Sequence, residues 1–171
     1  MPESCKTALM RLSGIVEESI VDGPGLRYVL FTQGCPHHCK GCHNLQTHSF
    51  EGGFLLTAEA ALAQMAENPL LSGITLSGGE PFAQAEALCA VAAGARAMGK
   101  SVVTYTGYVF EDLLARNDPW TDRLLDLTDI LVDGPYMEDL RDLELQFRGS
   151  SNQRLLDRAD RERIAAGLRR S

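Results

Sequence analysis

Long apolar runs are missing from this sequence. The longest, over residues 83–97, is interrupted by Glu86, Gly94 and Arg96, and none reaches the roughly 20 apolar residues that a membrane-spanning helix needs. The first residues show no pattern of a secretory or transit peptide. These absences predict a cytoplasmic protein with no membrane partner.

Repeats, low-complexity stretches and linkers are also absent, so we expect one domain over residues 1–171. Positive charge is in deficit, because 16 Lys and Arg residues stand against 23 Asp and Glu residues and give a formal net charge of −7. A protein this acidic is a poor general partner for nucleic acid. Arginines cluster in the C-terminal tail, where the interleaved acidic residues predict a solvated helix face.

Cysteine is scarce but concentrated. Three of the five cysteines form a C-x3-C-x2-C triplet, made by Cys35, Cys39 and Cys42. An odd count with three thiols in one loop favours a reducing compartment and metal ligation over a disulfide framework. A cubane [4Fe–4S] cluster normally takes four thiolates, and the sequence has no fourth cysteine nearby. The triplet therefore predicts a cluster with one open iron, which could bind a small molecule and pass it an electron.

Two other metal sites remain possible for the same segment. All four histidines of the chain lie in or beside it: His37, His38, His43 and His48. A structural zinc site of the Cys3His type is therefore chemically possible. The run from Cys39 to His43 also fits the C-x-x-C-H pattern of haem attachment. Haem attachment usually requires export and leaves Cys35 without a role, so zinc is the stronger alternative.

Four short, apolar, β-branched runs predict strands buried on both faces of a parallel sheet. They cover residues 27–32, 73–76, 101–105 and 129–132. Helical patterns cover residues 57–67, 83–98, 110–116 and 120–127. The β–α alternation predicts an α/β fold with a mostly parallel sheet and right-handed crossovers. Because a full eightfold barrel takes about 250 residues, we expect an incomplete (β/α) barrel or an open sheet.

Unusual residues follow each predicted strand. The cysteine triplet follows the first strand, Gly78-Gly79-Glu80 the second, Thr106 the third and Asp133 the fourth. The C-terminal ends of parallel strands share one edge, where ligands bind, so these loops should meet at one site. Gly78 and Gly79 would let backbone approach a ligand closely. Glu80 could pair with a cation such as an α-ammonium group or serve a helix N-terminus, and Asp133 could bind a ribose hydroxyl or form a turn.

Several segments together resemble a known family. They are Gly23-Pro24-Gly25-Leu26-Arg27, Gly34-Cys35, the cysteine triplet with His43-Asn44, and Gly78-Gly79-Glu80-Pro81. Over residues 14–156 the chain is similar to the glycyl-radical-enzyme activases of the radical S-adenosylmethionine (radical SAM) superfamily. Residues 131–136 and 148–154 most resemble the activators of anaerobic (class III) ribonucleoside-triphosphate reductase. The resemblance implies an incomplete barrel of the radical SAM type.

The resemblance also implies a site and a reaction. Cys35, Cys39 and Cys42 would hold three irons of a [4Fe–4S] cluster, and the fourth iron would bind S-adenosylmethionine. One electron would cleave the sulfonium to a 5′-deoxyadenosyl radical, which would take a hydrogen from the Cα of a glycine. The carbonyls of Gly78 and Gly79 would accept from the methionyl ammonium. The cofactor pocket implied in this way comprises Gly41, Cys42, His43, Gly78, Gly79, Glu80, Thr106 and Asp133.

The implied partner is the large subunit of an anaerobic ribonucleoside-triphosphate reductase, with an electron donor such as flavodoxin or a thioredoxin-type system. Three alternatives stay open: another glycyl radical enzyme of the pyruvate formate-lyase type, a small heterocycle as substrate, and a zinc-binding module without catalysis. Cys5 and Cys89 match no family motif. Cys89 falls in an alanine-rich helical pattern, which predicts a small buried hydrophobe.

Overall fold

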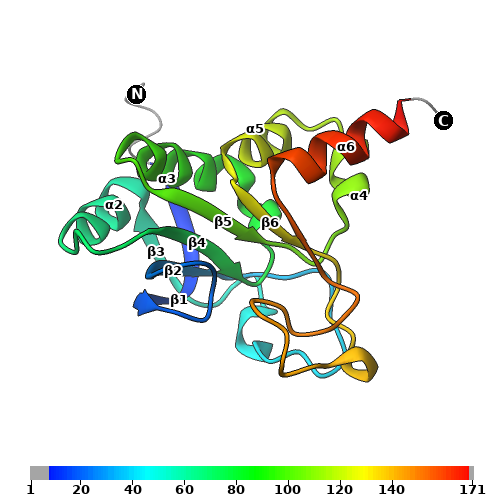
Figure 1. Cartoon of the computed structure of the whole chain (residues 1–171). Coiled ribbons are helices and arrows are strands. Elements are labelled where there is room, and N and C mark those ends of the chain that lie inside the picture. The colour runs from blue at the N-terminus through cyan, green and yellow to red at the C-terminus, as the bar shows by residue number, and fades with distance from the viewer. Residues whose placement is uncertain (1–7, 170–171) are drawn as a thin grey trace.

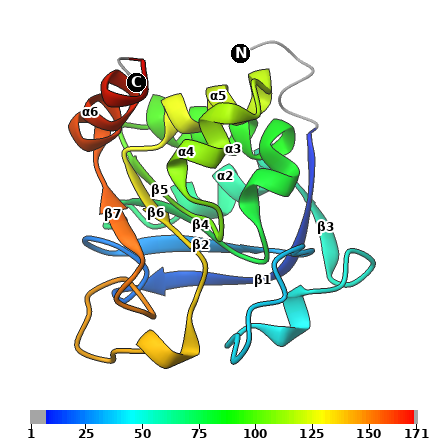
Figure 2. The same ribbon diagram turned by 90° about the vertical axis from the view of Figure 1, so that its right-hand side faces the viewer.

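A computed structural model describes residues 8–169 and shows one mixed sheet with helices on one of its faces (Figures 1 and 2). The sheet has seven strands in the order β3-β1-β2-β4-β5-β6-β7. Their bounds are Leu9–Ser19 (β1), Arg27–Thr32 (β2), Phe54–Thr57 (β3), Gly73–Gly78 (β4), Ser101–Tyr105 (β5), Ile130–Asp133 (β6) and Arg154–Leu156 (β7).

The four predicted strands form the middle of the sheet. Strands β2, β4, β5 and β6 pair in parallel, and their mostly buried side chains explain their continuous apolar sequence. The outer pairs, β1–β2, β1–β3 and β6–β7, are antiparallel. The expectation of a mostly parallel sheet therefore holds for the middle strands, but the described sheet as a whole is mixed.

The helices follow the predicted pattern with small shifts at their ends. Their bounds are Ala58–Ala66 (α2), Ala85–Ala97 (α3), Phe110–Ala115 (α4), Pro119–Leu127 (α5) and Arg158–Leu168 (α6). Thr57 caps α2, because its hydroxyl accepts from Ala60 N at 3.1 Å. Helix α3 starts at Ala85 because residues Pro81–Gln84 form a separate 3-10 helix. None of the described helices is long and apolar enough to cross a bilayer.

The core lies between the sheet and α3. Leu30 of β2, Leu76 of β4, and Leu88 and Val91 of α3 are all fully buried. Cys89 is also buried there, as predicted for a small hydrophobe. This packing holds β2, β4 and β5 in register, so that the loops after them emerge from one edge. The segments 33–53 and 134–153 extend beyond the sheet on the side away from the helices (Figures 1 and 2).

A buried arginine joins three strands at the edge of the sheet where the parallel strands begin. Arg27 begins β2 and is 1% exposed, and it donates to Thr75 Oγ1 at 3.1 Å, to Ser101 Oγ at 2.6 Å and to the Ile74 carbonyl. Burial lowers the pKa of this guanidinium to about 10. Arg27 thus joins β2, β4 and β5 through neutral oxygens.

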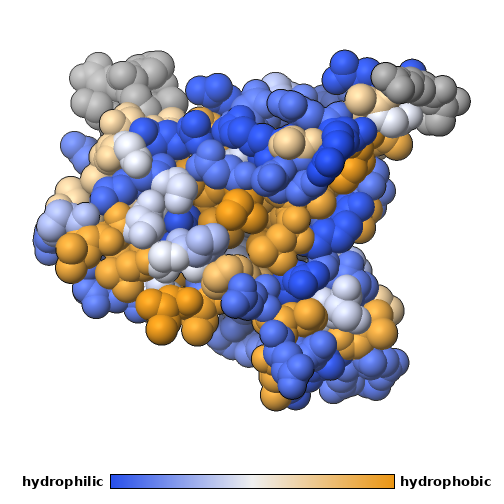
Figure 3. All heavy atoms as spheres, in the orientation of Figure 1, coloured by the Kyte–Doolittle hydropathy of each residue, from blue (hydrophilic) through white to orange (hydrophobic). Residues whose placement is uncertain are grey.

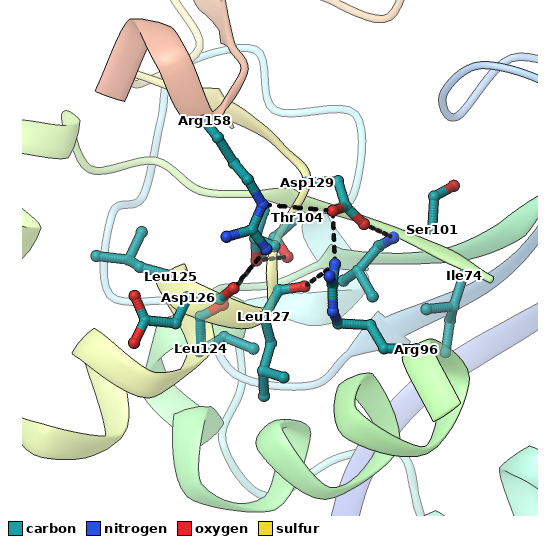
Figure 4. Close-up of polar contacts among 12 residues, drawn as sticks. Ile74, Arg96, Ser101, Thr104, Leu124, Leu125, Asp126, Leu127, Asp129 and Arg158 are labelled. Carbon is teal, nitrogen blue, oxygen red and sulfur yellow. Dashed lines mark hydrogen bonds and ion pairs between the residues drawn. The ribbon is translucent and has the colours of Figure 1, made fainter. Parts of the chain in front are cut away.

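The predicted solvated face holds for Arg158, Arg163 and Arg169, which are exposed, but not for Arg161. Arg161 is 6% exposed and donates to Leu125 O at 2.7 Å and Thr128 O at 2.6 Å. Arg158 donates to Asp126 O at 2.6 Å and lies 3.6 Å from Asp129 (Figure 4). These contacts dock α6 on α5, because the carbonyls at the end of a helix lack partners within it. Arg170 lies outside the described residues.

Candidate functional site

The loops after the parallel strands surround a cavity of about 340 Å³. Cys35, Cys39 and Cys42 line it from the segment after β2. Gly78 and Gly79 line it from the end of β4. The further lining residues are Asp22, Phe31, His37, His43, Asn44, Thr47, Ser77, Tyr105, Thr106, Gly107, Gly134, Tyr136, Gly149 and Gln153. The structure thus brings the triplet, the glycine pair, His43 and Thr106 together around one space.

Backbone hydrogen bonds fix the two ends of the cysteine loop, which we define as residues 35–42. Cys35 N donates to His48 O at 3.2 Å, and Cys42 N donates to Cys39 O at 3.2 Å. Cys35 is buried, whereas Cys39 and Cys42 are half-buried. Burial raises the pKa of the Cys35 thiol. A bound metal would reverse that preference, because a coordinating thiol is deprotonated outright.

The donors around the cavity fit an iron–sulfur cluster better than a single ion. Among the residues that the structure describes, no three His, Cys, Asp or Glu side chains converge closely enough to hold one metal ion. The three thiols instead lie around the wall of one cavity. A cubane cluster holds its ligand sulfurs farther apart than one zinc ion does, and thiolates are the ligands such clusters take.

The histidines near the triplet have other contacts. The ring of His37 lies 2.6 Å from Glu80 Oε2 through Nε2. The rings of His38 and His48 pack edge to face with centroids 5.3 Å apart. His43 lies at 5.1 Å from the ring of Tyr136, which is also part of the cavity wall. The Cys3His arrangement expected for a zinc site therefore receives no support from His37, whose Nε2 is already hydrogen-bonded.

Glu80 lies in a different place from the one expected of a ligand to an ammonium group. Its side chain is 0% exposed and is not part of the cavity lining. Glu80 Oε1 accepts from Phe82 N at 2.9 Å, which makes it the N-cap of the 3-10 helix after β4. Thr106, by contrast, lines the cavity and also bonds to Glu80 at 3.0 Å. Of the two roles that the sequence left open, the structure shows the helix N-terminus.

The glycine pair at the end of β4 is required for close contact with the end of β2. A Cβ on Gly78, whose φ is +96°, would meet the backbone of Phe31 and Thr32. A Cβ on Gly79 would meet the carbonyl of Gly34. Backbone atoms cannot yield as a flexible side chain can, so only glycine lets the β4 loop lie against the end of β2. The sequence predicted that a ligand would approach the backbone closely at these glycines. At their Cβ positions the close neighbour is instead the backbone at the end of β2.

Asp133 and Gly41 do not line the cavity. The carboxylate of Asp133 is fully buried, accepts from Phe110 N at 2.7 Å and pairs with Arg154. Its neighbour Gly134 lines the cavity instead. Gly41 has a φ of +72°, and a Cβ there would meet the side chain of Glu138. The geometry favours structural roles for both residues over contact with a cofactor.

The segment between β6 and β7 contributes a wall that residue types alone did not predict. Tyr136, Gly149 and Gln153 line the cavity from this segment. The Gln153 side chain accepts from Gly149 N at 2.9 Å and donates to Gly134 O at 3.1 Å, so it joins both ends of the segment. The resemblance to the family at residues 131–136 and 148–154 pointed to this segment, but it assigned no role to single residues.

Another cavity, of about 360 Å³, lies between α4, α5 and α6. Phe110, Leu125, Arg158 and Arg161 are among its lining residues. Its described lining has no cysteine or histidine, and its arginines already bond to carbonyls of α5 or its C-terminal end. The cavity at the cysteine loop is therefore the candidate site, although it is slightly smaller.

Comparison with known families first gives the class of protein. A family model described as a 4Fe-4S single cluster domain matches residues 21–156. The match covers most of the chain and confirms the expectation of a four-iron cluster domain.

Comparison with curated proteins gives the particular family. An anaerobic ribonucleoside-triphosphate reductase-activating protein from Salmonella typhimurium is 36% identical over 152 residues, which cover 84% of this chain and 96% of the relative. Proteins with the same name from Enterobacteria phage T4 and Escherichia coli K12 are 35% and 37% identical and cover 82% and 78% of this chain, and 89% and 90% of the relatives. The chain belongs to the family of anaerobic ribonucleoside-triphosphate reductase-activating proteins, as the sequence motifs predicted.

Proposed function

We propose that this protein is an enzyme that activates an anaerobic ribonucleoside-triphosphate reductase by generating a glycyl radical on its large subunit. The observation that carries the proposal is the shared cavity, where Cys35, Cys39 and Cys42 meet Gly78 and Gly79. The relatives are named as activating proteins of that reductase. The three thiols supply the cluster ligands that such chemistry needs.

Different residues of the cavity would bind the cluster and S-adenosylmethionine. Cys35, Cys39 and Cys42 would bind a [4Fe–4S] cluster, with S-adenosylmethionine beside it. When bound, the reduced cluster would supply one electron for cleavage of the sulfonium of S-adenosylmethionine to methionine and a 5′-deoxyadenosyl radical, which could take a hydrogen from a glycine Cα. Gly78 and Gly79 would accept from the methionyl ammonium through their carbonyls.

Other residues of the cavity would shape the pocket and limit the access of water. His43 is held against Tyr136 with ring centroids 5.1 Å apart, so its imidazole forms a fixed wall beside Cys42. Thr106 lines the opposite loop, where its hydroxyl is fixed by Glu80 at 3.0 Å. Rigid walls of this kind exclude water from a reactive intermediate.

The sheet supports a fold proposal of the same kind. We infer one domain over residues 1–171 in the form of an incomplete (β/α) barrel of the radical SAM type. Four parallel strands with the cavity at their C-terminal ends support it. The reaction would take place in the cytoplasm, with flavodoxin or a thioredoxin-type system as electron donor. The acidic charge of the chain disfavours nucleic acid as a partner.

A groove beside the cavity offers a route for the glycine. Val21 and Leu143 line a space of about 300 Å³ and are 70% and 82% exposed. This groove shares Asp22, His43, Tyr105 and Gly149 with the cysteine cavity. An extended apolar segment of the reductase lying there would bring its backbone to the edge of the cavity, and exposed apolar patches commonly mark such contacts.

The test combines this protein and the reductase subunit without oxygen, with a reductant and S-adenosylmethionine. Electron paramagnetic resonance should show a doublet radical on the reductase, and the doublet should narrow when its glycines carry deuterium at Cα. The 5′-deoxyadenosine formed should acquire that deuterium. If 5′-deoxyadenosine accumulates without the label, the glycine is not the hydrogen donor and a small heterocycle becomes the better substrate.

A further inference from the structure

We propose that Glu80 positions the cysteine loop and that it acts through His37. The sequence motif suggested that this glutamate would meet a ligand cation, but its carboxylate lies outside the cavity lining and is 0% exposed. The inference rests on the proposed function only in taking the three cysteines as the cluster ligands. It does not depend on which protein or molecule receives the radical.

The carboxylate of Glu80 is surrounded by donors of the protein itself. Oε2 accepts from His37 Nε2 at 2.6 Å and from Gly107 N at 2.9 Å. Oε1 accepts from Phe82 N at 2.9 Å, and the hydroxyl of Thr106 lies 3.0 Å from both oxygens. A carboxylate can only accept, so the His37 ring donates from Nε2. Each donor matters, because a buried charge that loses a partner is costly.

The backbone beside Glu80 is tied to the same loop. Gly79 N donates to Thr32 O and Glu80 N donates to Gly34 O, both at 2.8 Å. These two bonds hold the end of β2 immediately before Cys35. The side-chain bond to His37 adds a third point beyond Cys35, so the chain is held on both sides of the first cluster ligand.

The loop after β5 fixes the position of the His37 ring. The ring packs on Tyr108 with centroids 4.2 Å apart, and the guanidinium of Arg116 covers Tyr108 at 3.8 Å. A Cβ on Gly107 would collide with the imidazole. The His37 ring therefore packs in a site formed by the loop between β5 and α4 and by the C-terminal end of α4. These contacts restrict the movement of the cysteine loop.

His37 stands between Cys35 and Cys39 in the sequence. Fixing its ring limits how far the backbone between these two ligands can move. Glu80 therefore connects the loops that follow β4 and β5 to the cysteine loop. We assign it as a positioning residue, since it touches the loop that holds the cluster and not the cavity where a cofactor would bind.

A double-mutant cycle tests the link with Glu80→Gln, His37→Asn and the combined variant. The matched control is His38→Asn, because His38 lies in the same loop but packs on His48, and asparagine tolerates its φ of +49°. The reconstituted proteins would be mixed with an iron chelator without oxygen, and the rate of iron loss would be followed. In the apoproteins, hydrogen exchange across residues 35–42 gives a measurement that needs no cluster.

Both single variants should lose iron roughly tenfold faster than the parent, the factor expected for one hydrogen bond to a charged group. The combined variant should lose it no faster than the quicker single variant, since the two residues act through one contact. Exchange in the loop should rise in both, and His38→Asn should match the parent. Multiplying effects in the combined variant would overturn the proposal.

A direct cofactor role predicts a different pattern. Glu80→Gln would then retain iron normally and lose the spectral change that S-adenosylmethionine causes in the reduced cluster. If Glu80→Gln does not fold, His37→Asn alone decides, because normal iron retention in it contradicts the link. A working link with no radical on the reductase would overturn the proposed function and leave this inference standing.

Discussion

The three cysteines differ in their local surroundings. Cys35 is buried beside the end of β2, and burial raises the pKa of its thiol. Cys39 and Cys42 are half-buried at the other end of the loop, joined by a backbone bond of 3.2 Å. Without metal, burial therefore disfavours ionisation of the Cys35 thiol. A cluster bound by Cys35 would supply the interaction that stabilises its thiolate.

Replacing any one of Cys35, Cys39 or Cys42 by alanine should remove most of the cluster iron and abolish S-adenosylmethionine cleavage. A two-thiolate site lacks the ligands that hold a cubane. Iron content and the visible spectrum after anaerobic reconstitution measure the effect. The control carries Cys5→Ala and Cys89→Ala together. Loss of iron in that control would show that the ligand assignment is wrong.

Glu111 offers a pH-dependent test of the contacts that hold β7. Its carboxylate pairs with Arg154 at 2.7 Å, and this hydrogen bond holds the pKa of Glu111 below its ordinary value. The contact therefore stabilises the fold above the unfolded pKa, and that stabilisation is lost as pH falls through the folded pKa. Glu111→Gln should lower the free energy of unfolding by about 1 kcal/mol at pH 7 and by less in acid.

Urea unfolding of the apoproteins at neutral and acidic pH measures this difference. The matched control is Glu59→Gln, because Glu59 is an exposed glutamate in the first turn of α2, as Glu111 is in the first turn of α4. An effect of Glu111→Gln that stays constant with pH would show that the ion pair does not contribute.

Among the elements, the junction of β2 and β4 decides where the site lies. These strands pair in parallel from Arg27 opposite Gly73 to Thr32 opposite Gly78. Their ends continue as the cysteine loop and the glycine pair, so the register of the two strands sets the relative position of both loops. Gly78 forms the last pair, and Gly79 keeps the two backbones in contact beyond it.

Gly79→Ala should open this junction. The added Cβ would meet the carbonyl of Gly34, and forcing extra atoms into a packed site costs about 1–3 kcal/mol. We expect a lower thermal unfolding temperature together with weaker retention of iron. Gly14→Ala in β1 is the control, because a Cβ there has no neighbour within 4 Å. Equal stability of the two variants would contradict the close backbone contact.

The elements also show what the sequence could predict. Strands β2, β4, β5 and β6 were predicted because both of their faces are buried, which leaves a continuous apolar signal. Strand β1 was missed, since it contains Gly14 and its burial is irregular, and β7 is only three residues long. The cysteines and glycines of the site were predicted by residue type. For Glu80 the sequence left two roles open, because a carboxylate that caps a helix and one that binds a ligand look alike in sequence.

For the whole molecule, two strongly exposed apolar side chains mark the groove beside the cysteine cavity. Val21 and Leu143 stand beside the cysteine cavity and come from the β1–β2 turn and the segment between β6 and β7. Figure 3 shows apolar residues along the lower edge of the molecule, over the β1–β2 turn. Leu70 is similarly exposed, at 77%, but it lines neither the groove nor the cysteine cavity.

This contrast gives a test of partner docking. Val21→Asp and Leu143→Asp should each weaken binding to the reductase subunit by roughly tenfold or more, because each places a charge where apolar surface would be buried. Both variants should keep normal iron content and the normal spectral response to S-adenosylmethionine, since neither residue lines the cysteine cavity. Binding would be measured without oxygen by surface plasmon resonance on the immobilised reductase.

Leu70→Asp is the matched control, as it adds the same charge at a similarly exposed leucine that lines neither the groove nor the cysteine cavity. The glycyl radical yield should fall with binding in the groove variants and recover when the reductase concentration is raised. That recovery distinguishes a docking defect from damage to the site, because a damaged site would give a low yield at every concentration. Unchanged binding in both groove variants would mean that the reductase reaches the cavity by another route.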